Sequence, residues 1–174
     1  MKKNMLMMAA LLCCLMTLTA CGDDKDDPNV IATGTYTVTF SPDILDVASV
    51  IIYYKGNNNV NRFEAITPDM LRNNTWTKTV TSNKFPAEMG VQFVISLKEE
   101  SELTREKYNL VINSTFNGSV SGEGSHSDPE VICNYPEIEK KDVIKRMQGI
   151  NRKSHGFRIH KDGRFDHADL NYDI

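Results

Sequence analysis

Cysteine is scarce in this chain of 174 residues, which contains four in all. Cys13, Cys14 and Cys21 lie near the N-terminus, so Cys133 is the only one left in the rest of the sequence. An internal disulfide in that part of the chain is therefore excluded. Cys133 ends the apolar stretch Val131-Ile132-Cys133, which favours a small buried residue over a nucleophile.

The short motifs of common catalytic sites are also missing. The sequence contains no Gly-x-Ser-x-Gly elbow, phosphate-binding loop, His-Glu-x-x-His pair or dinucleotide fingerprint. The adjacent carboxylates Glu99 and Glu100 lie in a charged stretch without any sign of burial, so they are poor candidates for acid–base chemistry. We therefore expect a protein that is not an enzyme and that needs no cofactor.

Long hydrophobic runs and an excess of positive charge are two further absences. Beyond residue 20, no apolar run approaches the length of a membrane-spanning helix. The formal charge is −3, and removing Lys2 and Lys3 with the first 20 residues would bring it to −5. A net negative charge argues against general binding of nucleic acids. The remaining 154 residues suffice for one domain with a hydrophobic core.

The N-terminal segment carries the most specific signal in the sequence. Lys2 and Lys3 precede an apolar run from Met5 to Leu18, which is too short to remain in a bilayer as a spanning helix. The run ends in Leu18-Thr19-Ala20-Cys21, a leucine and two small residues directly before a cysteine. This order resembles the lipobox of bacterial lipoproteins. The resemblance implies that residues 1–20 are a signal peptide and that Cys21 becomes the lipidated first residue, anchored in the membrane.

An acidic spacer follows the cysteine. Gly22 to Pro28 includes four aspartates and one lysine, a composition that stays solvated. It resembles the start of Bacteroidetes lipoproteins that reach the outer face of the outer membrane. The resemblance implies an outer-membrane protein exposed on the cell surface, with residues 21–29 as its tether. A plain polar spacer on the periplasmic side is the alternative.

Period-two alternation of apolar and polar residues dominates residues 30–135. Tyr36, Val38 and Phe40 alternate with threonines, and similar alternation surrounds Trp76 and recurs over 91–97 and 108–112. Residues 47–54 are nearly all apolar, which predicts a central strand covered on both faces.

The spacing of these segments indicates the fold class. We expect turns around Pro86 and Gly90 and at Asn117-Gly118. About seven strands at intervals of eight to twelve residues favour an antiparallel β-sandwich, and we expect an immunoglobulin- or fibronectin-like arrangement.

Residues 136–174 predict one helix and a terminal β-hairpin packed on the same domain. Pro136 fits the first helical position, and Val143, Met147 and Ile150 form an apolar stripe. A three-residue loop over 161–163, with Gly163 left-handed, places the apolar hairpin residues on one face. A two-residue loop would mix the two faces.

Potential metal ligands are densest in this hairpin: His155, His160, Asp162, Asp166, His167 and Asp169. Zinc sites need ligands that converge in tetrahedral geometry. With the three-residue loop, His160 and His167 point to opposite faces, and the spacing matches no known ligand motif. We therefore expect no resident metal, and we keep a small metal-assisted hydrolase as an alternative.

Two surface features would suit a ligand but also have simpler explanations. Basic residues outnumber acidic ones between Lys140 and Arg164, which suits an anionic glycan or the solvated face of a helix. Tyr53, Tyr54 and Trp76 could stack on sugars, although the alternation favours the core. The leading hypothesis is a lipid-anchored, non-catalytic binding or assembly module for a glycan, envelope component or protein partner. A structural subunit of a surface complex is a further alternative.

Overall fold

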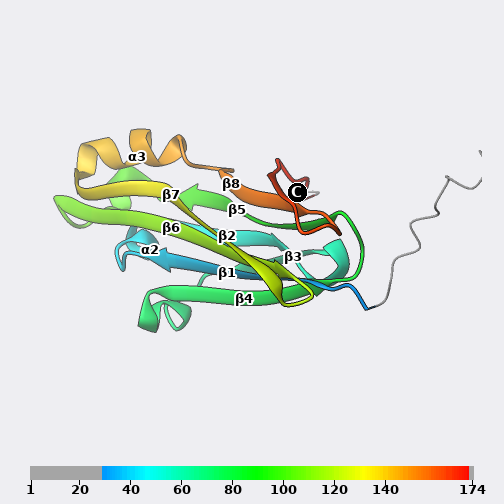
Figure 1. Ribbon diagram of the computed structural model, residues 1–174. Helices are drawn as coiled ribbons and strands as arrows, with labels where there is room; N and C mark the ends of the chain where they lie inside the picture. The colour runs from blue at the N-terminus through cyan, green and yellow to red at the C-terminus, as the bar shows by residue number, and fades with distance from the viewer. Residues whose placement is uncertain (1–28, 173–174) are drawn as a thin grey trace, which may run out of the picture.

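Two antiparallel sheets stacked face to face form the body of the protein (Figure 1). The computed structural model describes residues 29–172, so Cys21 and the spacer up to Pro28 lie outside the described residues. The strand order is β4-β1-β6-β7 in the first sheet and β3-β2-β5-β8-β9 in the second. The predicted mainly β sandwich with a C-terminal helix and hairpin is confirmed, whereas its immunoglobulin-like type stays a prediction.

The elements have the following bounds. The first sheet consists of β1 (Ala32–Phe40), β4 (Thr75–Ser82), β6 (Lys107–Val120) and β7 (Glu123–Glu139). The second consists of β2 (Ala48–Lys55), β3 (Asn61–Ala65), β5 (Ala87–Leu97), β8 (Ser154–Ile159) and β9 (Phe165–His167). Two α-helices, α2 (Ile44–Val47) and α3 (Lys140–Gln148), and three 3₁₀ turns, η1 (Asn57–Asn59), η2 (Met70–Asn73) and η3 (Glu100–Glu102), connect them.

The predicted alternation is confirmed where one sheet face packs on the other. In β1, Tyr36, Val38 and Phe40 point into the core, whereas the threonines between them lie on the outer face. In β2 the prediction of two covered faces is wrong, because Ile51 and Tyr53 point outward and are only half-buried. A central strand with an apolar outer face has the same hydrophobic pattern as a strand that is buried on both faces, so the sequence does not distinguish them.

The turn predicted around Pro86 is confirmed, since residues 83–86 connect β4 to β5. Gly90 and Gly118 lie inside strands, so the turns predicted at these two positions are wrong. Gly90 pairs with Gly156 of β8, and a Cβ atom on Gly90 would stand 2.7 Å from the Tyr172 hydroxyl. These glycines therefore permit close packing rather than a turn. The β6–β7 turn comes later, at Ser121 and Gly122, whose φ angles are +51° and +77°.

Residues 168–172, which we call the C-terminal strap, cross the outer face of the second sheet. The Ala168 N–H donates to the Gly156 carbonyl at 2.9 Å, and Leu170 and Tyr172 are buried. The strap also covers Lys55, whose ammonium donates to the Asn171 carbonyl at 2.6 Å and pairs with Glu88 at 3.3 Å. The strap thus gives part of the second sheet a third layer.

The helix predicted from Pro136 begins later, at Lys140. Ile138 still pairs with Tyr108 of β6, and Pro136 falls in the bulge where the β6–β7 register shifts. Proline is tolerated there because the bulged residue donates no ladder hydrogen bond. The predicted stripe of Val143, Met147 and Ile150 is buried and packs α3 across one end of the sandwich (Figure 1). Among the described residues, no helix has the length and apolar character needed to cross a membrane.

The terminal hairpin has the predicted three-residue loop. Ile159 pairs with Phe165 and Arg158 with Asp166, and Gly163 has a φ of +84°. β8 pairs directly with β5, so the hairpin extends the second sheet. The C-terminal residues therefore belong to the same sandwich as the strands before them.

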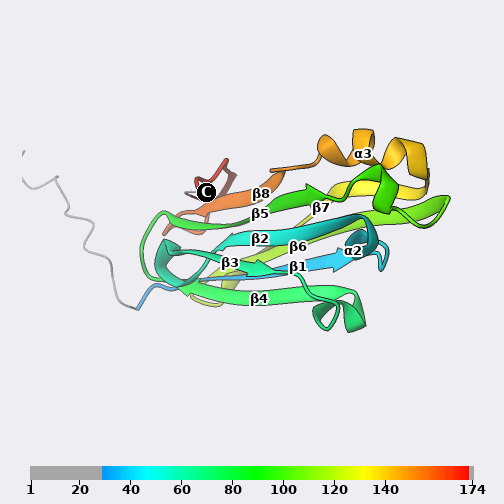
Figure 2. The same cartoon turned by 180° about the vertical axis from the view of Figure 1, so that it is seen from behind.

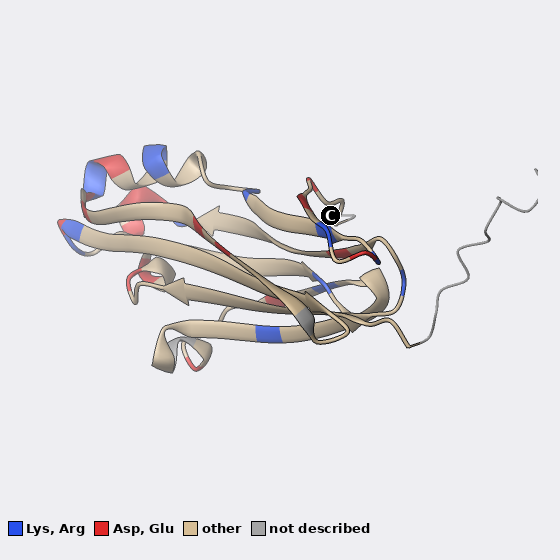
Figure 3. Ribbon diagram, viewed as in Figure 1, with Lys and Arg blue, Asp and Glu red and all other residues tan. Residues whose placement is uncertain are grey.

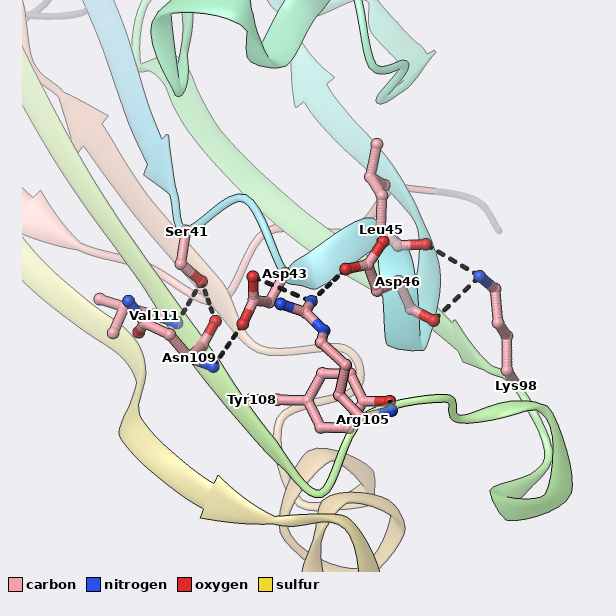
Figure 4. A network of polar contacts seen from close by, with 9 residues as sticks. All are labelled: Ser41, Asp43, Leu45, Asp46, Lys98, Arg105, Tyr108, Asn109 and Val111. Carbon is pink, nitrogen blue, oxygen red and sulfur yellow. Dashed lines mark hydrogen bonds and ion pairs between the residues drawn. The ribbon is translucent and has the colours of Figure 1, made fainter.

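The charged stretch between β5 and β6 is held by polar contacts at the α3 end of the sandwich (Figure 4). The Arg105 guanidinium lies 3.0 Å from an Asp43 oxygen, contacts Asp46, and stacks 4.9 Å over the Tyr108 ring. Lys98 donates to the last carbonyls of α2, those of Leu45 and Asp46. The segment between β5 and β6 is thus attached to α2 and to the start of β6.

One buried hydroxyl joins the two sheets. Tyr36 of β1 accepts a hydrogen bond from the Gly90 N–H at 2.9 Å and donates to the Lys55 carbonyl at 3.1 Å. It stands where the β2–β5 ladder stops, since Tyr54 and Val91 form its last pair. Burial, with smaller effects from neighbouring tyrosines, raises the pKa of Tyr36 well above its ordinary value.

Glu64 of β3 closes one long side of the sandwich. Its carboxylate accepts hydrogen bonds from the Trp76 indole at 2.9 Å, from the Tyr54 hydroxyl at 3.0 Å, and from Lys78. Burial alone would raise the pKa of Glu64, but the hydrogen bonds from Lys78, Trp76 and Tyr54 together lower it. The charged Glu64 carboxylate thereby joins the edge strands β3 and β4 through hydrogen bonds.

We expect Tyr36→Phe to destabilise the fold by about 1–3 kcal/mol, because it leaves a buried N–H and a buried carbonyl without their partner. Urea unfolding of the purified protein measures this loss. Tyr53→Phe changes a half-buried tyrosine on the outer face of β2 and should stay within about 0.5 kcal/mol. Equal effects of the two substitutions would contradict the bridging role of Tyr36.

We expect Glu64→Gln to cost about 2 kcal/mol near neutral pH, because hydrogen bonds to a charged acceptor are lost. Folding lowers the pKa of Glu64 from its ordinary value of 4.5. The stabilisation of the fold by the ionised carboxylate is therefore fully present above pH 4.5, and it is lost as the pH falls through the lowered pKa of the folded protein. The difference between wild type and variant should therefore shrink in acid. Glu137→Gln, at an exposed glutamate of β7, serves as the control. If the stability difference between wild type and Glu64→Gln persists in acid, the stabilisation does not come from the ionised carboxylate.

Candidate functional site

The second long side of the sandwich, between β7 and the β8–β9 hairpin, contains a polar cleft of about 310 Å³. We call it the edge cleft. Its lining consists of Glu130, Ser154, His155, Gly156, His167, Ala168 and Asp169. Strands from both sheets and the C-terminal strap meet there, so the cleft depends on the packing of the whole sandwich.

His155 is the buried polar residue of the edge cleft. It pairs with Val91 in the β5–β8 ladder, and its side chain is 1% exposed. One ring nitrogen, Nδ1, lies 3.0 Å from the Ser114 hydroxyl of β6. The other, Nε2, has no hydrogen-bond partner within the described part of the chain. A buried polar atom without a partner is costly, so this nitrogen needs an explanation.

Two carboxylates face that nitrogen. Asp128 Oδ2 lies 3.5 Å and Glu130 Oε2 3.9 Å from His155 Nε2, both too far for a good hydrogen bond. The same Asp128 oxygen lies 3.2 Å from Nε2 of His167, whose side chain is 75% exposed. One carboxylate oxygen is thus shared between two imidazoles.

Aromatic rings position both histidines. Phe157 lies between them, with ring centroids 5.2 Å from His155 and 4.6 Å from His167. His126 of β7 stacks on Phe165 at 4.8 Å and contacts Phe157 edge-on at 5.4 Å. The Phe157 ring therefore packs against both histidines of the cleft.

The structure divides the histidines and aspartates identified in the sequence. His155, His167 and Asp169 line the edge cleft. His160 and Asp166 lie on the other face of the hairpin, where His160 Nε2 is 2.7 Å from Asp166 Oδ2. Asp162 accepts the Arg164 N–H within the loop. The predicted opposite orientation of His160 and His167 is confirmed.

Sequence reasoning missed Ser114, Asp128 and Glu130. The last two follow His126 at intervals of two residues, which is the period of one strand face. The alternation identified in the sequence did not include these positions, so this face was not identified. No pattern in the sequence identifies Ser114 as a site residue, because its proximity to His155 depends on how the two sheets stack.

Ser114, His155 and Asp128 follow the hydroxyl, imidazole and carboxylate order of hydrolytic triads. Ser114 is 1% exposed on the inner face of β6, so its hydroxyl cannot reach a substrate. Cys133 is equally enclosed, and its thiol donates to the Leu110 carbonyl at 3.1 Å. Burial raises the pKa of Cys133 to about 11, despite the nearby Lys153, so the thiol stays protonated and unreactive.

The aromatic and basic residues singled out in the sequence are mostly engaged within the fold. Trp76 and Tyr54 are buried, and Tyr53 packs on the exposed Phe63 ring at 5.6 Å. Three basic residues between 140 and 164 have partners in the fold: Lys141 with Glu139, Arg158 with Glu88, and Lys153 with the Ile132 carbonyl. Lys140 and Lys141 also line a charged hollow of about 370 Å³ at the α3 end of the sandwich.

No group of three or more His, Cys, Asp or Glu side chains in the described part of the chain is arranged to hold a metal ion as the side chains stand. The edge cleft comes nearest among the candidate residues, since it brings two imidazoles to one carboxylate oxygen.

Comparison with protein-family models, curated proteins and solved structures finds no match to this chain. The sequence and the geometry of the described residues therefore carry the functional argument.

Proposed function

We propose that the protein is a lipid-anchored lipoprotein of the outer membrane, exposed on the cell surface, whose β-sandwich is a non-catalytic binding or assembly module. In this proposal Cys21 carries the lipid and residues 21–29 are the tether. The ligand is a glycan, an envelope component or a protein partner. The lipobox order in the sequence supports the anchor, and the edge cleft supports the binding role.

The observation that carries the binding role is the unpartnered Nε2 of His155. On the opposite side the carboxylate of Glu64 accepts three hydrogen bonds, whereas His126 Nε2 and the Tyr172 hydroxyl, like His155 Nε2, have no partner within the described part of the chain. Retaining a buried nitrogen without a partner lowers the stability of the free protein. A ligand that enters the cleft and pairs with this nitrogen recovers that free energy on binding.

The arrangement of the ends suits presentation from a membrane. β1 begins at the end of the sandwich that also holds the β6–β7 turn, and α2 and α3 lie at the opposite end (Figures 1 and 2). Roughly ten residues separate Cys21 from Ala32, and an extended stretch of that length spans up to about 35 Å. With a lipid on Cys21, a tether of this length allows α3 to face away from the membrane.

Charged residues lie at both ends of the sandwich (Figure 3). Acidic and basic residues concentrate around α3 and near the C-terminal strap, whereas the strands are mostly uncharged (Figure 3). A hollow of about 370 Å³ at the α3 end is lined entirely by charged residues: Glu100, Glu106, Lys107, Glu139, Lys140 and Lys141. Such a surface favours contact with water over contact with lipid.

Cys21→Ala should release the protein from the membrane fraction, because the substitution removes the acceptor of the lipid anchor. Fractionation of cells with and without detergent measures this, and Cys133→Ala, at a buried cysteine, is the matched control. The wild-type protein should also be cleaved by protease added to intact cells. Continued membrane association of Cys21→Ala would refute the anchor, and complete protection from protease would place the domain on the periplasmic side.

Glycan arrays and capture from defined envelope fractions, with the purified mature protein as bait, should identify a ligand that depends on the edge cleft. Asp128→Asn and His167→Ala should each weaken its binding about tenfold, the equivalent of 1.4 kcal/mol. His160→Ala removes a histidine of the same hairpin from the opposite face and should leave binding unchanged. Equal binding by all variants would exclude the edge cleft as the site.

A further inference from the structure

We infer that the edge cleft binds one divalent transition-metal ion of the Zn²⁺ type, with His155, His167, Asp128 and Glu130 as its ligands. This inference rests on the binding role proposed for the cleft and adds a metal ion to that cleft. The ligand set differs from the hairpin residues that the sequence suggested, because two of its members come from β7 of the other sheet.

Two of the distances among the four groups are close to those in a metal site. Metal–ligand bonds of about 2.0–2.1 Å in a tetrahedron place neighbouring ligand atoms about 3.3 Å apart. Asp128 Oδ2 lies 3.2 Å from His167 Nε2 and 3.5 Å from His155 Nε2. Glu130 Oε2, at 3.9 Å from His155 Nε2, needs a small additional approach.

The side chains that must move are the exposed ones. The described side chains are not yet arranged around one point. His167 is 75% exposed and Glu130 is 41% exposed, so each can change rotamer without disturbing the core. His155, at 1% exposed, is fixed. In the proposed site, the two exposed side chains therefore move toward the ion, and the buried His155 stays in place.

The environment of His155 suits a metal ligand. Metal-bound histidines donate the N–H of their other ring nitrogen to a neighbouring acceptor, which fixes the tautomer. The Ser114 hydroxyl lies 3.0 Å from Nδ1 and can accept that N–H. Nε2 then carries a lone pair and no proton, with carboxylate oxygens of Asp128 and Glu130 at 3.5 and 3.9 Å, and a bound cation supplies the partner that this nitrogen lacks.

The charge of the edge cleft favours a cation. Asp128, Glu130 and Asp169 bring three carboxylates to a site whose two imidazoles are neutral when they bind metal. Two nitrogen and two oxygen ligands suit zinc better than magnesium or calcium, which prefer oxygen alone. A fixed anion such as phosphate would meet these carboxylates and be repelled.

The test is titration of the mature lipidated protein, stripped with a chelator and kept in detergent, with Zn²⁺ and with Co²⁺. Calorimetry gives the stoichiometry and affinity, and the visible absorption of Co²⁺ reports tetrahedral coordination and the presence or absence of thiolate ligands. The variants are His167→Ala, Asp128→Asn and His155→Gln. His160→Ala is the control, because it removes a histidine with its own carboxylate partner from the same hairpin.

We expect one Zn²⁺ per chain, a tetrahedral Co²⁺ spectrum without thiolate bands, and affinity lowered at least about tenfold by His167→Ala and Asp128→Asn but not by His160→Ala. His167 is exposed, so its variant tests the site even if His155→Gln fails to fold. Absence of stoichiometric binding, or equal affinity of His167→Ala and wild type, overturns the inference. If binding of the ligand found by arrays still depends on the cleft in that case, the proposed function stands without the metal.

Discussion

The hydroxyl of Tyr36 is the contact on which much of the remaining structure depends. It replaces a backbone pair at the point where β2 and β5 separate, and it ties both strands to β1 of the opposite sheet. Strand alternation places the Lys55 side chain on the outer face of β2, where it pairs with Glu88 and donates to the C-terminal strap. The strap in turn packs Tyr172 against Gly90, the residue that donates to Tyr36. A single core hydroxyl thus links the inner packing to the outer layer.

The two long sides of the sandwich are closed by different chemistry. On one side, Glu64 accepts hydrogen bonds from three partners and joins β3 to β4. On the other side, Asp128 lies between His155 and His167 at distances of 3.5 and 3.2 Å and leaves Nε2 of His155 without a hydrogen bond. A fully satisfied network contributes rigidity, whereas a partly satisfied one leaves capacity for a ligand. This asymmetry favours the second side as the functional one.

The sequence was most informative where a local rule decides the structure. Alternation placed Tyr36 and its neighbours on the core face, and the loop ending in Gly163 fixed the register of the last hairpin. Prediction failed where the deciding contact is distant. Gly90 resembles a turn residue because the strap that requires a glycine there is about eighty residues away, and Pro136 resembles a helix start because the β6–β7 bulge is not visible locally. The candidate site was half predicted for the same reason, since Asp128 and Glu130 reach the histidines only through sheet stacking.

The late position of the last hairpin and strap in the chain affects how the sandwich is completed. β5 obtains its second neighbour, β8, only after some sixty further residues have followed it. Until then one edge of β5 is unpaired, and an open apolar strand edge can associate with other chains. β8 carries His155 and Gly156 of the edge cleft, so this part of the cleft forms only when β8 pairs with β5 and covers that edge.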